Sequence, residues 1–250
     1  MNAPDPAPVD VVDGFTILGH AQTPIGTLYL GRRRIEGVPD WVYEIQISGQ
    51  LLMSSYHSVS EKQLATSALA LHEGTGPLRV LVGGLGLGYT AVAALQSEQV
   101  TLVRVIEKMD FVQNWMDQGL LPLSDIFAND ERLEIVQGDV YQHLAENPTE
   151  QYDLILVDVD HAPDDRLAEG DGHFYTPDGQ RQVARHLAPG GVLAVWSAWD
   201  NDAFAKVLSG VYPRSVREDV SWDDIETPGE TFHNVLFFGG GTAVASEAAH

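Results

Sequence analysis

The chain has no cysteine and few basic residues among its 250 residues. Without cysteine it has no disulfide framework, thiol nucleophile or cysteine metal ligand, which leads us to expect a reducing, cytoplasmic location. Lys and Arg number 14 against 36 Asp and Glu, giving a net charge of −22. We therefore expect no nucleic-acid partner, because phosphate binding needs clustered positive charge, and we expect attraction of a cationic small molecule.

Long hydrophobic runs are also missing. No stretch of about 18 apolar residues occurs, and the N-terminus has neither a basic region nor an apolar segment of the kind found in secretory signals. We expect no membrane span and no signal peptide. The hydrophobic fraction of 44% and the charged fraction of 20% indicate a globular chain. Residues 1–12 and 241–250 are small, polar or proline-containing, and we expect both to be disordered tails.

Short β-type runs separated by turn signals occupy residues 15–55, which predicts a small antiparallel β-unit over residues 13–57. A helix follows, with Ser60 ahead of a run of helix formers and Gly74 after it. From Leu78 onward strands and helices alternate, and the chain closes with two strands that have no helix between them. Residues 58–240 are therefore predicted to form a doubly wound, Rossmann-like α/β domain, with a mostly parallel seven-stranded sheet and an antiparallel edge pair.

Polar or glycine-rich segments follow three of the predicted parallel strands. The loop GGLGLG links the first strand to a helix, and its glycines Gly83, Gly84, Gly86 and Gly88 would let the backbone approach a ligand at the helix N-terminus. Glu107 ends the next strand, where nucleotide-binding folds place an acid for the ribose hydroxyls. The pair Gly138 and Asp139 ends another strand, where the carboxylate either binds an adenine amino group or caps the next helix. Together these features predict an adenosine-containing ligand.

A further acidic segment, Asp158-Val-Asp160-His161, ends the most apolar strand. A carboxylate at such an edge opens into the ligand crevice with an apolar wall behind it, which raises its pKa toward that of a general base. We take Asp158, Asp160 and His161 as the catalytic candidates, the alternative being that the acids bond to the following loop. Aromatic side chains near the same edge are candidates for contact with an alkylammonium substrate, although many such side chains serve the core; they are Tyr175, Trp196 and Trp199.

Motifs for other chemistries are absent. The nine histidines show no metal-binding spacing, and no nucleophile elbow or GxxxxGK phosphate loop occurs. We therefore expect no metal.

The glycine loop, the acid in VIEKMD, the pair in VQGDVYQHL, and LVDVDHAP followed by FYTPDGQRQVARHLAPGGVLAVW resemble the spermidine/spermine synthase (polyamine aminopropyltransferase) family. The resemblance covers roughly Phe15 to Gly239, and it places the chain on the AdoMet-dependent methyltransferase fold rather than among the dinucleotide oxidoreductases that share the layout. It implies transfer of an aminopropyl group from decarboxylated AdoMet to an amine, with release of methylthioadenosine. It further implies that Asp158 activates the amine and suggests a homodimer or larger assembly. His57 lies near the start of the helix after the β-unit, where the N-terminal part of family members closes over the site, so we take it as a candidate substrate contact; the alternative is a surface histidine.

The sequence departs from the family pattern at four positions. Leu87 stands where the family has an acid near the amine of its donor, and the acids Asp158 and Asp160 are one residue closer than usual. Glu61 and Gln63 stand where the family has Tyr and Glu. Two alternatives therefore stay open: a methyltransferase that uses intact AdoMet, and a non-catalytic protein that binds an adenosyl ligand.

Overall fold

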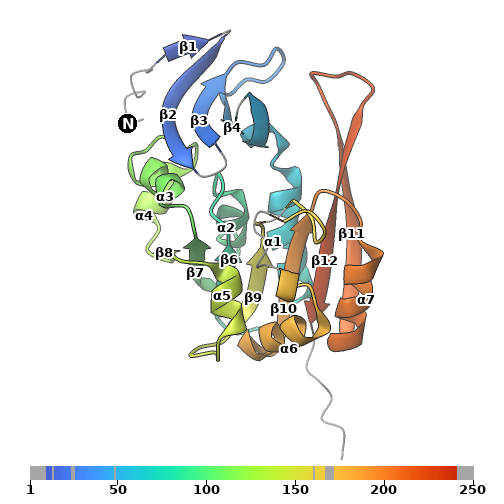
Figure 1. The fold of residues 1–250 in the computed structure, drawn as a ribbon. Coiled ribbons are helices and arrows are strands. Elements are labelled where there is room, and N and C mark those ends of the chain that lie inside the picture. Colours follow the sequence, from blue (N-terminus) through green and yellow to red (C-terminus); the bar gives the residue numbers. More distant parts are fainter. Residues whose placement is uncertain are drawn as a thin grey trace, which may run out of the picture.

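The N-terminal part of the chain forms a five-stranded sheet (Figure 1). The computed structural model describes residues 10–12, 14–23, 26–47, 49–159, 161–166 and 172–240. Each neighbouring pair of strands in this sheet is antiparallel, in the order β1-β2-β3-β4-β5. The predicted β-unit is confirmed, with strands β1 (Asp10–Val12), β2 (Phe15–Thr23), β3 (Gly26–Arg33), β4 (Val42–Ile47) and β5 (Gln50–Ser54).

The rest of the chain builds a seven-stranded sheet in the order β11-β12-β10-β9-β6-β7-β8. The five strands from β10 to β8 are parallel, whereas β12 is antiparallel to both β10 and β11. The predicted sheet and its antiparallel edge pair are therefore confirmed. Its strands are β6 (Leu78–Gly83), β7 (Val100–Glu107), β8 (Leu133–Gln137), β9 (Tyr152–Val157), β10 (Leu187–Ser197), β11 (Arg214–Asp223) and β12 (Thr231–Gly240).

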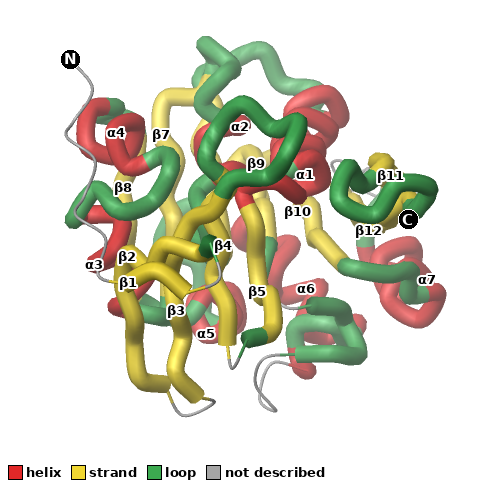
Figure 2. The backbone as a smooth tube through the Cα atoms, turned by 90° about the horizontal axis from the view of Figure 1, so that it is seen from above, coloured by secondary structure: helices red, strands yellow, loops and turns green. Residues whose placement is uncertain are grey.

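Helices cover both faces of this sheet (Figure 2). They are η1 (Ser55–His57), α1 (Val59–Leu71), α2 (Tyr89–Ala94), α3 (Asp110–Asp117), α4 (Ser124–Asn129), α5 (Val140–Ala145), α6 (Pro177–His186) and α7 (Asp202–Val211). The sequence reasoning missed α4, because its six residues, SDIFAN, are too few to show a period and three of them are poor helix formers.

The central parallel strands β6 and β9 are apolar at most positions because both of their faces are buried, whereas the edge strand β8 is partly exposed. In β9, Leu154 and Leu156 belong to the cluster packed under α1, α2 and α3. Ile155 and Val157 alternate with them and belong to the cluster under α5, α6 and α7. Successive side chains of a strand point to opposite faces, so this one run supplies two cores.

The five-stranded sheet lies over the carboxyl edge of the parallel strands (Figure 1). Its buried side chains Leu28 and Leu30 share one apolar cluster with Leu85 of the glycine loop and Trp115 of α3. A Cβ built on Gly86 would lie 3.7 Å from the Met53 sulfur of β5. The β-unit therefore packs directly on the loop expected to hold the ligand.

Two predicted boundaries change. Ser60 does not cap α1: the helix begins at Val59, and the Ser60 hydroxyl bonds instead to side chains of distant elements. Asp10–Val12 pair with β2, so the β-unit begins inside the segment predicted as an N-terminal tail. The predicted C-terminal tail, 241–250, lies outside the described residues. The described helices are all too short or too polar to cross a bilayer.

Candidate active site

The glycine loop adopts a backbone that side chains disfavour. Gly84, Gly86 and Gly88 have φ values of +90°, +49° and +91°. A Cβ on Gly84 would lie 2.3 Å from the carbonyl oxygen of Asp158, and a Cβ on Gly83 would lie 2.8 Å from the side chain of Val140. The loop is therefore held tightly against the end of β9, with its backbone leading into the first turn of α2.

Glu107, at the end of β7, is 5% exposed and bonds to the loop. Its two carboxylate oxygens accept hydrogen bonds from the backbone amides of Leu85 and Met109, each at 2.7 Å. Burial raises the pKa of Glu107, and the backbone amides oppose that rise. Glu107 therefore organises the glycine loop, a role that the sequence reasoning did not assign; ribose binding stays a prediction.

Replacing Glu107 by glutamine should cost about 1–3 kcal/mol of stability, because an amide NH₂ would then face a buried backbone N–H. Urea unfolding measures the loss. The control is Glu98→Gln at an exposed position, for which we expect no change in stability. Equal stability of the two variants would contradict the assigned role.

Asp139 caps α5, as one of the two alternatives predicted. Its carboxylate accepts from the amides of Tyr141 at 2.9 Å and Gln142 at 3.3 Å, and its second oxygen lies 2.6 Å from the Lys108 ammonium. Burial would raise the pKa of Asp139, but Lys108 and the helix amides outweigh it and lower the pKa. A carboxylate has lone pairs beyond those that the cap uses, and adenine binding by Asp139 stays a prediction.

A cavity of about 220 Å³ lies beside Asp139, between α5 and the start of α6. Tyr141, His173 and Phe174 are among its lining residues. Tyr175, a predicted substrate contact, lies behind this wall: its hydroxyl is 3.2 Å from that of Tyr141 and its ring packs on Phe174. The structure thus places Tyr175 on the Asp139 side of the site.

Asp158 follows directly on β9 and is half-buried. Its Oδ2 accepts a hydrogen bond of 2.8 Å from the Thr90 hydroxyl in the first turn of α2. Burial raises the pKa of Asp158 to about 6, against the effect of the Thr90 hydrogen bond. The carboxyl group is therefore fixed beside the glycine loop with the raised pKa that the sequence reasoning expected of a general base.

A second acid joins Asp158, and the sequence reasoning missed it as a site residue. Glu61, in the first turn of α1, is half-buried, and burial together with the charge of Asp158 raises its pKa to about 8. The Thr90 hydroxyl lies 3.4 Å from the Glu61 carbonyl oxygen, which ties the start of α1 to the same place. The signal in the sequence that could have identified Glu61 as a site residue is its departure from the family pattern, which has Tyr at this position.

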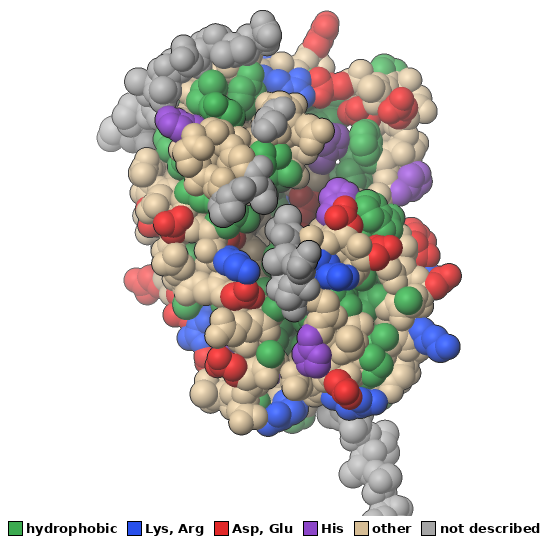
Figure 3. Space-filling model, in the orientation of Figure 1, with side chains coloured by type: hydrophobic (Ala, Val, Ile, Leu, Met, Phe, Trp, Pro, Cys, Tyr) green, Lys and Arg blue, Asp and Glu red, His purple; other side chains and the backbone are tan. Residues whose placement is uncertain are grey.

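His161 and the two predicted tryptophans come together on the other side of the site. The exposed His161 ring packs edge-on against Trp199 at 4.8 Å and lies 6.5 Å from Trp196. The Trp196 indole donates to Ser60, and that of Trp199 donates to Asp164. Figure 3 shows this face of the molecule hollowed below the N-terminal sheet, with acidic atoms visible inside the hollow.

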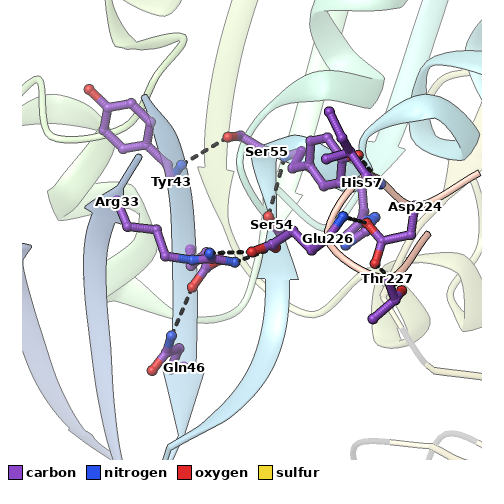
Figure 4. A network of polar contacts seen from close by, with 12 residues as sticks. Arg33, Tyr43, Gln46, Ser54, Ser55, His57, Asp224, Glu226 and Thr227 are labelled. Carbon is purple, nitrogen blue, oxygen red and sulfur yellow. Dashed lines mark hydrogen bonds and ion pairs between the residues drawn. The ribbon is translucent and has the colours of Figure 1, made fainter. Parts of the chain in front are cut away.

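His57 lies in a separate contact between the β-unit and the β11–β12 hairpin (Figure 4). Its Nδ1 accepts from the Trp222 indole at 3.1 Å, and burial lowers its pKa although Asp224 and Glu226 oppose this. Arg33 of β3 makes two hydrogen bonds of 2.7 Å to Glu226 in the hairpin loop. His57 is therefore half-buried in a joint that holds the hairpin to the β-unit, and its contact with substrate stays a prediction.

Asp160 lies outside the described residues. Within the part of the chain that is described, no group of three or more His, Asp or Glu side chains is arranged to hold a metal ion.

The geometry defines a class: a Rossmann-like chain with a glycine loop whose glycines have positive φ, acids at the ends of parallel strands and a β-sheet over the carboxyl edge. Comparison with known proteins shows which members of this class the chain is similar to. The chain is 30% identical over 119 residues to Polyamine aminopropyltransferase 2 of Streptomyces coelicolor. The match covers 47% of this chain and 21% of that relative, so the matched segment corresponds to about a fifth of the relative's length. No family model matches the chain.

Solved structures agree with this similarity. A spermidine synthase in complex with the transition-state analogue AdoDATO superposes with a TM-score of 0.66 and 17% identity, covering 95% of this chain and 83% of that one. Spermidine synthase from Thermotoga maritima superposes with a TM-score of 0.61 and 17% identity, and the match covers 90% of this chain and 72% of that one. The chain has the spermidine synthase fold, and the predicted resemblance to the spermidine synthase family is confirmed.

Proposed function

We propose that the chain transfers an aminopropyl group from decarboxylated AdoMet to an amine and releases methylthioadenosine. The observation that carries the proposal is the fixed Asp158 carboxyl beside the glycine loop, hydrogen-bonded to Thr90 and with a raised pKa. The sequence similarity to a polyamine aminopropyltransferase supports the same reaction. The alternative of a methyltransferase becomes an outcome of the test below.

In the proposed site the chain's own residues bind and orient both substrates. Glu107 and the backbone of Gly84 to Gly88 hold the ribose and the donor tail, while Asp139 and the neighbouring cavity take the adenine. That cavity is smaller than a complete ligand pocket, which suits one part of a ligand such as a base. The exposed ring of Trp199, with His161 beside it, offers a wall for the carbon chain of an amine.

The reaction is a displacement at carbon. Asp158 takes a proton from the incoming ammonium, which frees the nitrogen lone pair and neutralises the carboxylate. The nitrogen then attacks the aminopropyl carbon bound to the sulfonium, a C–N bond forms, and the C–S bond breaks with its electrons going to sulfur. Methylthioadenosine leaves as a neutral thioether. The net charge of −22 favours the approach of a cationic amine.

We expect methylthioadenosine release when the purified protein is given decarboxylated AdoMet and a diamine, measured by chromatography across a panel of diamines and monoamines. Absence of release with every amine would overturn aminopropyl transfer. Methylated product from intact AdoMet would favour the methyltransferase, and binding without turnover of either donor would favour a non-catalytic adenosyl-binding protein.

The proposal includes an arrangement of parts. In this proposal the β-unit, residues 13–57, closes over the site of the catalytic part, residues 58–240. We also propose a cytoplasmic location and a homodimer, as expected from the sequence. Light scattering of the purified chain tests the homodimer directly.

A further inference from the structure

Glu61 reaches the site from an element that the motif pattern does not include. Its Oε2 accepts a hydrogen bond of 3.0 Å from Ser60, whose side chain is fully buried. The Ser60 hydroxyl also lies 2.9 Å from the Trp196 indole nitrogen and 2.9 Å from the Asn234 side chain. Strands β10 and β12 therefore hold the first turn of α1 in place, and Glu61 with it.

The charged and titratable groups around Glu61 come from three elements. Asp158 faces it from the end of β9, and Tyr89 faces it from α2. On α1 itself, Lys62 places its ammonium 4.7 Å from the centre of the Tyr89 ring. Near neutral pH the carboxyl pair carries about one negative charge, which the Lys62 ammonium partly offsets. As the pair loses its second proton in mildly alkaline solution, it carries two negative charges and outweighs that cation.

The glycine loop supplies no charged side chain to this place. Leu85 and Leu87 are 4% and 5% exposed and pack into the apolar cluster shared with the β-unit. The loop therefore presents its backbone to a ligand, and a charge at the end of the ligand has to be recognised by another element. The Thr90 hydroxyl lies within hydrogen-bond distance of both the Glu61 carbonyl oxygen and the Asp158 carboxylate, so Glu61 is the nearby acid that can supply this recognition.

We infer that Glu61 is a specificity-determining residue that selects a donor whose tail ends in an ammonium group without a carboxylate. The inference rests on the proposed function, which lays the donor tail along the glycine loop. A tail with a lone ammonium is attracted by the Glu61 and Asp158 carboxyls, whereas in a tail that also carries a carboxylate the repulsion of that carboxylate offsets the attraction of the ammonium. Decarboxylated AdoMet is therefore preferred over AdoMet, and the preference grows as Glu61 ionises.

Calorimetric titration of the wild type and Glu61→Gln with both donors, at pH 6.5 and pH 8.5, tests the inference. For the wild type we expect the ratio of the two affinities to favour decarboxylated AdoMet and to rise several-fold between the two pH values. In Glu61→Gln we expect the ratio at pH 8.5 to fall about tenfold and its pH dependence to be largely lost. Glu61→Asp should restore part of the preference for decarboxylated AdoMet and part of its pH dependence.

Two controls separate charge recognition from a change in folding. Methylthioadenosine has no charged tail, so its affinity should be the same in the wild type and in Glu61→Gln if the fold is intact. Glu218→Gln removes a half-buried acid on β11 that bonds to Gln63 of the same helix, and it should leave the donor ratio unchanged.

The outcomes distinguish this inference from the proposed function. An unchanged donor ratio in Glu61→Gln, with normal methylthioadenosine binding, would overturn the role of Glu61 and leave aminopropyl transfer standing. A wild-type preference for intact AdoMet at pH 6.5 and at pH 8.5 would overturn the role of Glu61 and aminopropyl transfer together. Loss of methylthioadenosine release with every amine, together with the expected change in donor ratio, would overturn the reaction but keep the charge selection.

Discussion

Asp158→Asn is expected to lower the rate of group transfer by roughly two to four orders of magnitude, the usual contribution of a positioned general base. The asparagine keeps the size of the side chain and can still contact Thr90, but it cannot take a proton from the incoming ammonium. Because the base is removed while the donor contacts remain, the loss should fall on kcat, with a modest change in donor affinity. Steady-state kinetics of methylthioadenosine release measures both.

The wild-type rate should also depend on pH in a way that the variant does not share. Asp158 acts as a base when it is ionised, so the rate should rise with pH through its pKa of about 6 and fall away below it. In Asp158→Asn the residual rate should lack this acid limb. Asp153→Asn is the matched control, because Asp153 lies on the same strand at the opposite edge of the sheet, where its carboxylate accepts from the Arg79 amide. A near-normal rate in Asp158→Asn would overturn the assignment.

Gly84→Ala is expected to cost about 3–5 kcal/mol of stability and to abolish binding of the adenosyl group. Two costs combine at this position. An alanine at φ +90° is strained, and its Cβ would lie 2.3 Å from the Asp158 carbonyl oxygen, so the backbone of the loop or of β9 must move. Movement of that backbone displaces Asp158 as well, which links stability to catalysis. Urea unfolding and methylthioadenosine titration measure the two effects.

Gly119→Ala separates strain from collision. Gly119 has φ +73°, a similarly strained backbone for alanine, but a Cβ there would meet nothing within 4 Å. Its replacement should cost about 1 kcal/mol and leave ligand binding intact. If the two variants lost equal stability, the close contact between Gly84 and Asp158 would have no energetic weight.

The mostly parallel sheet and the acids at its carboxyl edge could be predicted because their signals are local. Apolar runs such as YDLILV, bounded by acids and turn residues, indicate buried parallel strands, and the carboxyl ends of such strands meet at one edge. Helix α4 could not be predicted in the same way. It is stabilised by its position, where Phe127 packs over Gly88 at the end of the glycine loop.

The amino-acid sequence alone determined the fold class and the glycine loop, and it led to the proposal that Asp158 is the reactive carboxylate, because each depends on residues close together in the chain. The tertiary structure decided which distant side chains meet. Contrary to expectation, Ser60 does not cap the helix but accepts a hydrogen bond from Trp196. Glu61 lies close to Asp158 although its helix is far away in the sequence. His57 joined the hairpin contact with Trp222. Contacts of this kind depend on how the helices and the two sheets pack against one another, and no local pattern of residues encodes that packing.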